Sequence, residues 1–173
     1  MFTSQINLSD SQLCGLNWKG EGTYTVEGIA AIADALKVNA SVTRVDVRLN
    51  GITGEGASQL SAAVLANANI EVFNEIPIKE MRANSLTELD LNEKSIGTEG
   101  GMVVAGLLPA MASLTTIDLS ANSLGDEGVI ALCDALNESK VTQLKLEVSD
   151  NRIESAGFSA LRNARRREVE INF

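Results

Sequence analysis

The chain has 173 residues, an apolar content of 45% and a formal net charge of −9. This length predicts one domain, and the acidic balance argues against nonspecific binding to nucleic acids or anionic membranes while it favours a basic protein partner. Aromatic residues make up only 3% of the chain, so the core is expected to be aliphatic.

The ends and cysteines of the chain bear on its location. The first ten residues contain neither a basic start nor an apolar run, so no secretory signal is expected. No stretch has the length and apolar character of a membrane span. Cys14 and Cys133 stand far apart in the repeats described next and are expected to be reduced and structural. A cytoplasmic location is therefore expected.

Glycines recur at Gly28, Gly56, Gly100, Gly128 and Gly157. Most of them are separated by about 28 residues, and self-similarity at such a period predicts a repeat solenoid. Each glycine follows a segment with apolar residues two apart, the spacing of a strand, and precedes apolar residues four apart, the spacing of a helix. Each unit therefore reads as a strand, a turn and a helix, and stacked units bury one another's apolar faces.

In chain order, the units are expected at about 3–41, 42–69, 70–85, 86–113, 114–142 and 143–167, followed by a capping strand at 168–173. The unit 70–85 is only about half as long as the others. Within it, the sequence predicts a strand around Val72 and Phe73 and then a tight return through Pro77. The strand is expected to end before Pro77, because proline cannot donate a hydrogen bond to a strand ladder.

The turn of several units contains an asparagine: Asn50, Asn122 and Asn151. An asparagine amide can both donate to and accept from backbone groups, so these side chains are expected to form a buried ladder. Lys94 and Ser11 stand at the same position of two other units. Lysine cannot accept a hydrogen bond, so the ladder is expected to be interrupted at Lys94. Acidic residues precede the repeat glycines and are expected in the first turns of the helices, where they face the positive end of the helix dipole.

The pattern resembles the leucine-rich repeat, L-x-x-L-x-L-x-x-N-x-L. The segment SLTTIDLSANSLGDEGVIALCDALNES, residues 113–139, carries the resemblance most clearly. The unit length, the glycine and the long helix are similar to those of the ribonuclease-inhibitor-like subclass. The resemblance implies an α/β solenoid, a right-handed arc with parallel strands on the concave face and helices on the convex face. The subclass includes inhibitors, receptor sensors, GTPase activators and cytoskeletal regulators.

The outward positions of the strands are the first candidate for partner binding, because side chains alternate along a strand. These candidates are Arg44, Asp46, Arg48, Glu88, Asp90, Asn92, Thr116, Asp118, Ser120, Lys145 and Glu147. Their middle column, Asp46, Asp90, Asp118 and Glu147, forms an acidic stripe that could receive basic side chains of a protein partner. The alternative is that these carboxylates are simply tolerated in water.

The insertion between Leu13 and Gly28 is the second candidate, because it holds Trp18 and Tyr24. These two residue types are enriched at binding hot spots. The other interpretation is that both rings fold back over the first unit and cap the solenoid.

Catalysis is not expected. The chain contains no histidine, and a solvated strand face neither excludes water nor shifts pKa values as an active site requires. Neither catalytic residues nor metal ligands nor a cofactor are therefore assigned. The leading hypothesis is a protein-binding module or scaffold that uses the concave face and edge loops. The alternatives are regulation of a small GTPase, since the resemblance extends to Ran GTPase-activating proteins, and a structural part of a larger repeat protein.

Overall fold

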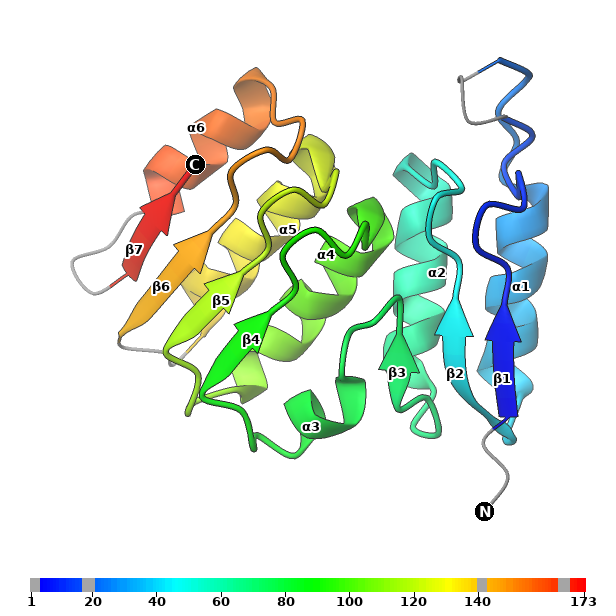
Figure 1. The fold of residues 1–173 in the computed structure, drawn as a ribbon, viewed down its shortest axis with the longest axis horizontal. Helices are drawn as coiled ribbons and strands as arrows, with labels where there is room; N and C mark the ends of the chain where they lie inside the picture. Colours follow the sequence, from blue (N-terminus) through cyan, green and yellow to red (C-terminus); the bar gives the residue numbers. More distant parts are fainter. Residues whose placement is uncertain (1–3, 17–20, 140–142, 165–168) are drawn as a thin grey trace.

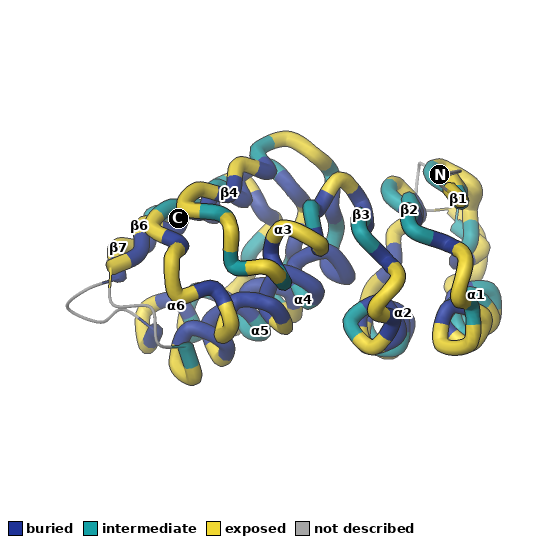
Figure 2. Tube along the Cα trace, turned by 90° about the horizontal axis from the view of Figure 1, so that it is seen from below, coloured by how far each residue is buried: buried dark blue, intermediate teal, exposed yellow. Residues whose placement is uncertain are grey.

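The structure is a computed structural model that describes residues 4–16, 21–139, 143–164 and 169–173. Strands and helices alternate along the chain and form two layers (Figures 1 and 2). The strands are β1 (Ser4–Asn7), β2 (Val42–Asp46), β3 (Val72–Phe73), β4 (Glu88–Asp90), β5 (Thr116–Asp118), β6 (Leu144–Glu147) and β7 (Val169–Asn172). The helices are α1 (Glu27–Val38), α2 (Gly54–Ala66), α3 (Ile78–Arg82), α4 (Gly97–Leu107), α5 (Gly125–Glu138) and α6 (Ser155–Ala164), and a 3-10 turn, η1 (Leu108–Ala110), follows α4.

The strands form two parallel sheets. One has the order β1-β2-β3 and the other the order β4-β5-β6-β7, and neighbouring strands follow one another in sequence. The alternation of elements and the parallel pairing confirm the predicted α/β repeat solenoid. Figure 1 shows that the strand layer is divided between β3 and β4.

The division follows from the short segment between β2 and β4. The chain reverses directly after β3, where Asn74 and Glu75 adopt left-handed backbone angles (φ of 48° and 69°) and Phe73 forms a bridge with Ile76. Pro77 then precedes the five-residue helix α3. The predicted strand at Val72–Phe73 is confirmed, whereas the chain reverses at Asn74 and Glu75 instead of through Pro77, and the short helix was not expected.

One apolar core nevertheless joins the two parts. Ile76, Ile78 and Met81 from the short segment are fully buried and belong to the same cluster as the core residues of both sheets. Leu89 on β4 and Ile117 on β5 are also buried, as are Leu91 and Leu119, which directly follow these strands. The tube in Figure 2 shows buried positions running between the strand and helix layers across the whole array. The units thus bury one another's apolar faces, as a solenoid requires.

At two of the repeat glycines, Gly100 and Gly157, the helix approaches the preceding turn too closely for a side chain. A Cβ atom at Gly100 would lie 2.7 Å from the Cβ atom of Ile96, and one at Gly157 would lie 2.6 Å from Cγ2 of Ile153. Ile96 and Ile153 are the apolar residues just before the helix in their units. A side chain at Gly100 or Gly157 would therefore push the helix off the turn that leads into it.

The asparagine ladder has the expected form in the second sheet. The side-chain amide of Asn122 donates to the carbonyl oxygens of Leu91 (2.7 Å) and Leu119 (2.9 Å). Its Oδ1 accepts from the backbone amide of Ile96 (3.2 Å). Asn151 repeats these contacts one unit further on. Lys94 is exposed, so the predicted interruption of the ladder at this unit is confirmed.

Candidate functional site

The outward residues of β4, β5 and β6 lie in register on the open face of the second sheet. Asp90 pairs with Asp118, and Asp118 pairs with Glu147. Neighbouring strands lie about 4.8 Å apart, so the three carboxylates form a contiguous acidic column. Glu88 and Asp90 are exposed, while Asp118 and Glu147 are half-buried.

The carboxylates of this column differ in how far they are neutralised. Glu147 forms an ion pair with Lys145 (2.9 Å) and accepts from the Asn172 side-chain amide (2.7 Å), and these bonds, that to Asn172 first, lower the pKa of Glu147. Among the described residues, Asp90 accepts from the backbone amide of Asn92 alone (3.0 Å).

Asp118 has polar partners but no cationic one. It accepts from the backbone amide (2.9 Å) and from the hydroxyl of Ser120, and this hydroxyl also accepts from the Asn92 side chain (2.6 Å). In the part of the chain that the structure describes, no cation lies within ion-pair distance of Glu88, Asp90 or Asp118. We call these three residues the acidic patch.

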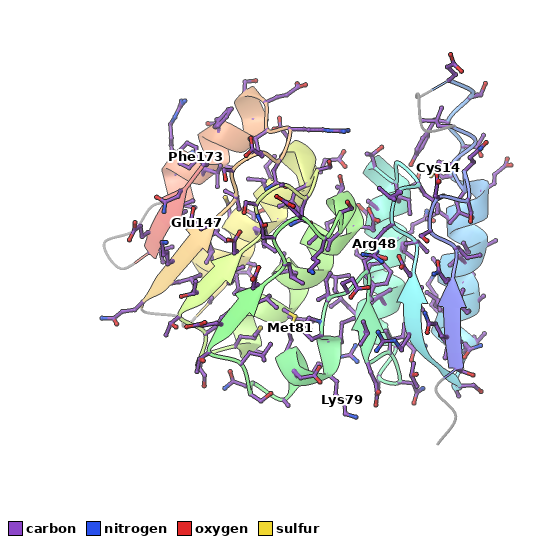
Figure 3. All side chains as sticks on the ribbon, viewed as in Figure 1. Cys14, Arg48, Lys79, Met81, Glu147 and Phe173 are labelled. Carbon is purple, nitrogen blue, oxygen red and sulfur yellow. The ribbon has the colours of Figure 1, made fainter. Side chains whose placement is uncertain are left out.

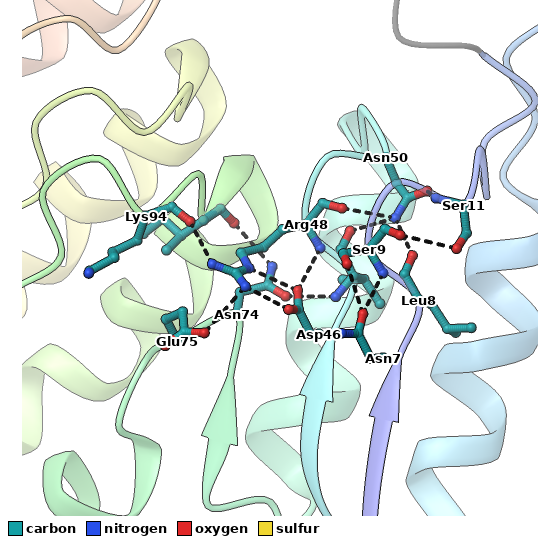
Figure 4. A network of polar contacts seen from close by, with 12 residues as sticks. Asn7, Leu8, Ser9, Ser11, Asp46, Arg48, Asn50, Asn74, Glu75 and Lys94 are labelled. Atoms are coloured by element: carbon teal, nitrogen blue, oxygen red, sulfur yellow. Dashed lines mark hydrogen bonds and ion pairs between the residues drawn. The ribbon is translucent and has the colours of Figure 1, made fainter.

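Asp46 does not join this column. It lies on β2 in the first sheet, where Arg48 holds it with two bonds, Nε to Oδ1 (2.9 Å) and Nη2 to Oδ2 (2.7 Å) (Figure 4). These bonds to Arg48 lower the pKa of Asp46. The expected four-residue stripe is therefore divided, because the short segment after β3 separates the two sheets. Figure 3 shows Arg48 and Glu147 far apart on the two parts.

The Arg48 side chain is half-buried and bonded within the chain, and does not stand free on the strand face for a partner. Besides Asp46, its guanidinium donates to the carbonyl oxygen of Lys94 (3.2 Å) and contacts the Glu75 carboxylate (3.3 Å). It thus links β2 to the turn that follows β4 and bridges the division of the strand layer. Arg44, the remaining candidate on β2, is half-buried and stands in register with Gln5 and Val72.

The other strand-face candidates surround the acidic patch. Thr116 is half-buried between Glu88 and Lys145 on the neighbouring strands. Lys145 is exposed, and its contact with Glu147 makes the β6 part of the face mixed in charge. The β4–β5 part is consequently the more acidic one.

Tyr24 packs onto the second unit. Its hydroxyl donates to the carbonyl oxygen of Thr53 (2.8 Å) and lies 3.3 Å from the Thr53 amide, and burial raises its pKa. The residue as a whole is 36% exposed. These contacts tie the insertion to Thr53, the residue before α2 in the second unit, whereas the capping interpretation placed the ring over the first unit. Trp18 lies outside the described residues.

Glu99 is a residue whose environment the sequence did not reveal. Its position in the first turn of α4 predicted an acid facing the helix dipole, but the residue is only 3% exposed and its pKa is raised to about 8 by loss of solvation. Its Oε1 accepts from the Asn74 side-chain amide (3.1 Å), and its Oε2 has no hydrogen-bond partner among the described residues. Glu99 lines a pocket of about 570 Å³ at the loop edge of the solenoid.

The described residues contain no group of three or more histidine, cysteine, aspartate or glutamate side chains placed to hold a metal ion. None of their helices is both long and apolar enough to cross a membrane.

The comparisons with known proteins agree with the repeat architecture. The family model described as "Leucine Rich repeat" matches residues 38–61 and 110–133. Curated protein sequences give no significant match. Among solved structures, the chain is similar to one described as "Leiomodin-1 Actin-Binding Site 2 (ABS2)", with 17% sequence identity, a TM-score of 0.41, and coverage of 82% of this chain and 77% of that one. A likeness at this level carries no argument about function. Each of the two matched segments includes a strand, the turn after it and the first part of the following helix of the solenoid.

Proposed function

We propose that this chain is a protein-interaction module that binds a basic surface of a protein partner through the acidic patch on β4 and β5. The observation that carries the proposal is the set of three carboxylates, Glu88, Asp90 and Asp118, that lie together on the open strand face without a cation at ion-pair distance in the described part.

The physical reason is electrostatic. Like charges on directly opposite strand positions repel one another, and Asp90 stands opposite Asp118. Lysine or arginine side chains of a partner relieve this repulsion and gain charge-assisted hydrogen bonds. The net charge of −9 strengthens the attraction at longer range and favours a fast encounter with a basic partner.

Several finer assignments belong to the same proposal. The spacing of the units and the packing of the repeat glycine support membership of the ribonuclease-inhibitor-like subclass. The buried free thiols of Cys14 and Cys133 support a reducing compartment such as the cytoplasm. As a binding module, the chain is expected to leave the hydrolysis rate of small GTPases unchanged, which separates it from the rival role as a GTPase regulator.

The experiment compares affinity capture of partners by two charge-reversal variants. Asp90→Lys with Asp118→Lys reverses the acidic patch. Asp134→Lys with Glu138→Lys makes the same change of net charge on exposed positions of α5 and is the matched control. Circular dichroism and urea unfolding establish that both variants are folded.

We expect the strand-face variant to lose partners that wild type and control both retain, with affinity for an identified partner reduced by about tenfold or more, equivalent to about 1.4 kcal/mol. Equal capture by wild type and the strand-face variant would show that the acidic patch is not the binding surface. Equal losses in both variants would assign the effect to net charge alone.

A further inference from the structure

The turns that follow the strands form the loop edge of the solenoid, along the upper side of the view in Figure 1. The pocket of about 570 Å³ lies on this edge, and its lining is drawn from the loops after β1, β2, β4, β5 and β6. We call it the edge pocket. Because it spans the junction between the two sheets, its walls come from both parts of the chain.

The first part of the chain provides an apolar wall. Ile52, in the loop after β2, is buried, and Leu49, at the start of the same loop, is 66% exposed. Leu16 adds to this wall from the insertion that was a candidate for partner binding, where it forms a bridge with Gly22. Accessible apolar side chains in a concave site are typical anchors of a ligand.

Leu49 is an unusual residue for its position in the repeat. Its backbone is left-handed (φ of 61°), as it is at the same place in the turn of every other unit that carries this turn. The residues at that place in the other units are polar or small: Asp10, Glu93, Ala121 and Asp150. A left-handed backbone is unfavourable for leucine, and an exposed side chain gains little from burial. Leu49 therefore adds little to the stability of the free chain, whereas it can anchor an apolar group of a ligand.

Two charged side chains belong to opposite ends of the lining. Asp10 comes from the turn after β1, and Arg152 comes from the loop between β6 and α6. Both are exposed, and within the described residues neither forms an ion pair with the other or with a third residue. Glu99 also lines the pocket, but it is buried and mostly protonated near neutral pH, since its pKa is raised to about 8.

The order of these features along the edge follows from the order of the strands. Asp10 and Leu49 belong to the neighbouring strands β1 and β2 of the first sheet, whereas Arg152 follows β6 of the second sheet. Ser95 and Ser123 line the pocket from the loops after β4 and β5, which lie in between. The lining is thus negative at one end, apolar next to it and positive at the other end. A complementary occupant carries a cation, an apolar group and an anion in the same order.

We propose that the edge pocket receives an extended loop segment of the protein partner that carries a basic, an apolar and an acidic side chain in this order. The basic side chain pairs with Asp10, the apolar one packs on Leu49, and the acidic one pairs with Arg152. This inference rests on the proposed function, since it assigns a second contact to the same interaction. The acidic patch is not part of the pocket lining, so the two contacts can be tested separately.

The test uses the full ¹⁵N-labelled chain and the acetylated, amidated peptide Lys-Gly-Leu-Gly-Glu. The glycines let an extended backbone present all three side chains on one side. We expect saturable shifts of the Leu49, Ser95 and Ser123 amide signals, with Kd on the order of 1 mM. Three control peptides, with serine for leucine, glutamine for lysine or glutamine for glutamate, should each bind at least about threefold more weakly. Equal binding of the serine peptide, or no saturable shift at about 10 mM, would overturn the proposal.

A substitution at Leu49 separates binding from folding. Leu49→Asn removes the apolar side chain but keeps a residue that adopts the left-handed backbone readily, so the variant should fold and bind the peptide about fivefold more weakly or worse. Ala121→Asn is the matched control, at the same place in the turn after β5 and outside the pocket lining. It should leave binding unchanged. Equal affinities of the two variants would contradict the role of Leu49.

Two further variants test the charges and separate this contact from the acidic patch. In Arg152→Gln, the preference for the glutamate peptide over its glutamine counterpart should disappear, and a preference that persists would contradict the pairing with Arg152. Asp90→Lys with Asp118→Lys should bind the peptide as wild type does. Loss of peptide binding in that double variant would place the peptide on the acidic patch, which would overturn the edge-pocket proposal and leave the proposed function standing.

Discussion

The buried carboxyl of Glu99 predicts an unusual pH dependence of stability. Its pKa is raised from 4.5 to about 8 in the folded chain, because burial penalises the charged form. Between these values, the folded state keeps a proton that the unfolded state has released. The free energy of unfolding is therefore expected to fall as the pH rises from about 4.5 to 8 and then to become flat as far as this group is concerned.

The substitution that exposes this effect is Glu99→Gln. The new side chain keeps the shape of the protonated carboxyl and its oxygen can still accept from Asn74, while its NH₂ group stands where Oε2 has no partner. Each pKa unit corresponds to about 1.4 kcal/mol, so the variant should gain roughly 3–5 kcal/mol over wild type between pH 4.5 and pH 8. Near pH 4.5 the two proteins should be almost equally stable.

The assay is urea unfolding of both proteins at intervals of one pH unit, with Glu55→Gln as the matched control in the exposed first turn of α2. The difference between wild type and Glu99→Gln should grow by about 1.4 kcal/mol per pH unit within the window. A difference that stays constant from pH 4.5 to 8 would refute the reasoning, since it would mean that Glu99 titrates alike in the folded and unfolded states.

Three further substitutions test the packing and the polar links. Leu119→Ala should lower the free energy of unfolding by about 2–5 kcal/mol through a core cavity, and a loss below about 1 kcal/mol in urea unfolding would contradict the register of the repeats. Arg48→Met should cost about 1–2 kcal/mol, because the link to the Lys94 carbonyl oxygen is lost, and faster hydrogen exchange in β2 than in β6 would locate the damage. Tyr24→Phe should cost about 1 kcal/mol by removing the hydroxyl bonded to Thr53; an unchanged melting curve would exclude a capping role.

The solenoid could be predicted because its determinants are local and repeated. Ile117 and Leu119 stand two residues apart, as on one face of an extended segment, and Leu132 and Leu136 stand one helical turn apart. The sequence of each unit alone therefore predicts its strand and its helix. The turn asparagines could be assigned in the same way. Their bonds lie between neighbouring units, and a regular spacing guarantees which units are neighbours.

The features around the short segment could not be predicted, because they depend on units that are not regularly stacked. Asn74 acts in the ladder although it does not stand at the asparagine position of the repeat. Arg48 reaches Lys94 only because the two parts of the strand layer meet there. Glu99 has the sequence environment of an exposed first-turn acid, and its burial arises from the turn of the chain at Asn74. The short length of the unit at 70–85 did indicate, in the sequence, that the repeats meet at an irregular junction there.

The acidic strand face was predicted in part. The register of Asp90, Asp118 and Glu147 follows from the repeat period and is found in the second sheet. The separation of Asp46 from this column could not be foreseen, since it results from the reversal of the chain after β3. The neutralisation of Glu147 depends on Asn172 from the last strand, which lies opposite it in the sheet.

The most direct test of the binding proposal is carboxylate footprinting of the chain with and without a captured partner. A carbodiimide couples glycine ethyl ester to accessible carboxylates, and mass spectrometry reads the extent of labelling at each residue. Binding through the acidic patch predicts that labelling of Glu88, Asp90 and Asp118 falls when the partner is present, while that of Asp134 and Glu138 on α5 stays the same. Protection of the α5 carboxylates with unchanged labelling of the acidic patch would contradict it.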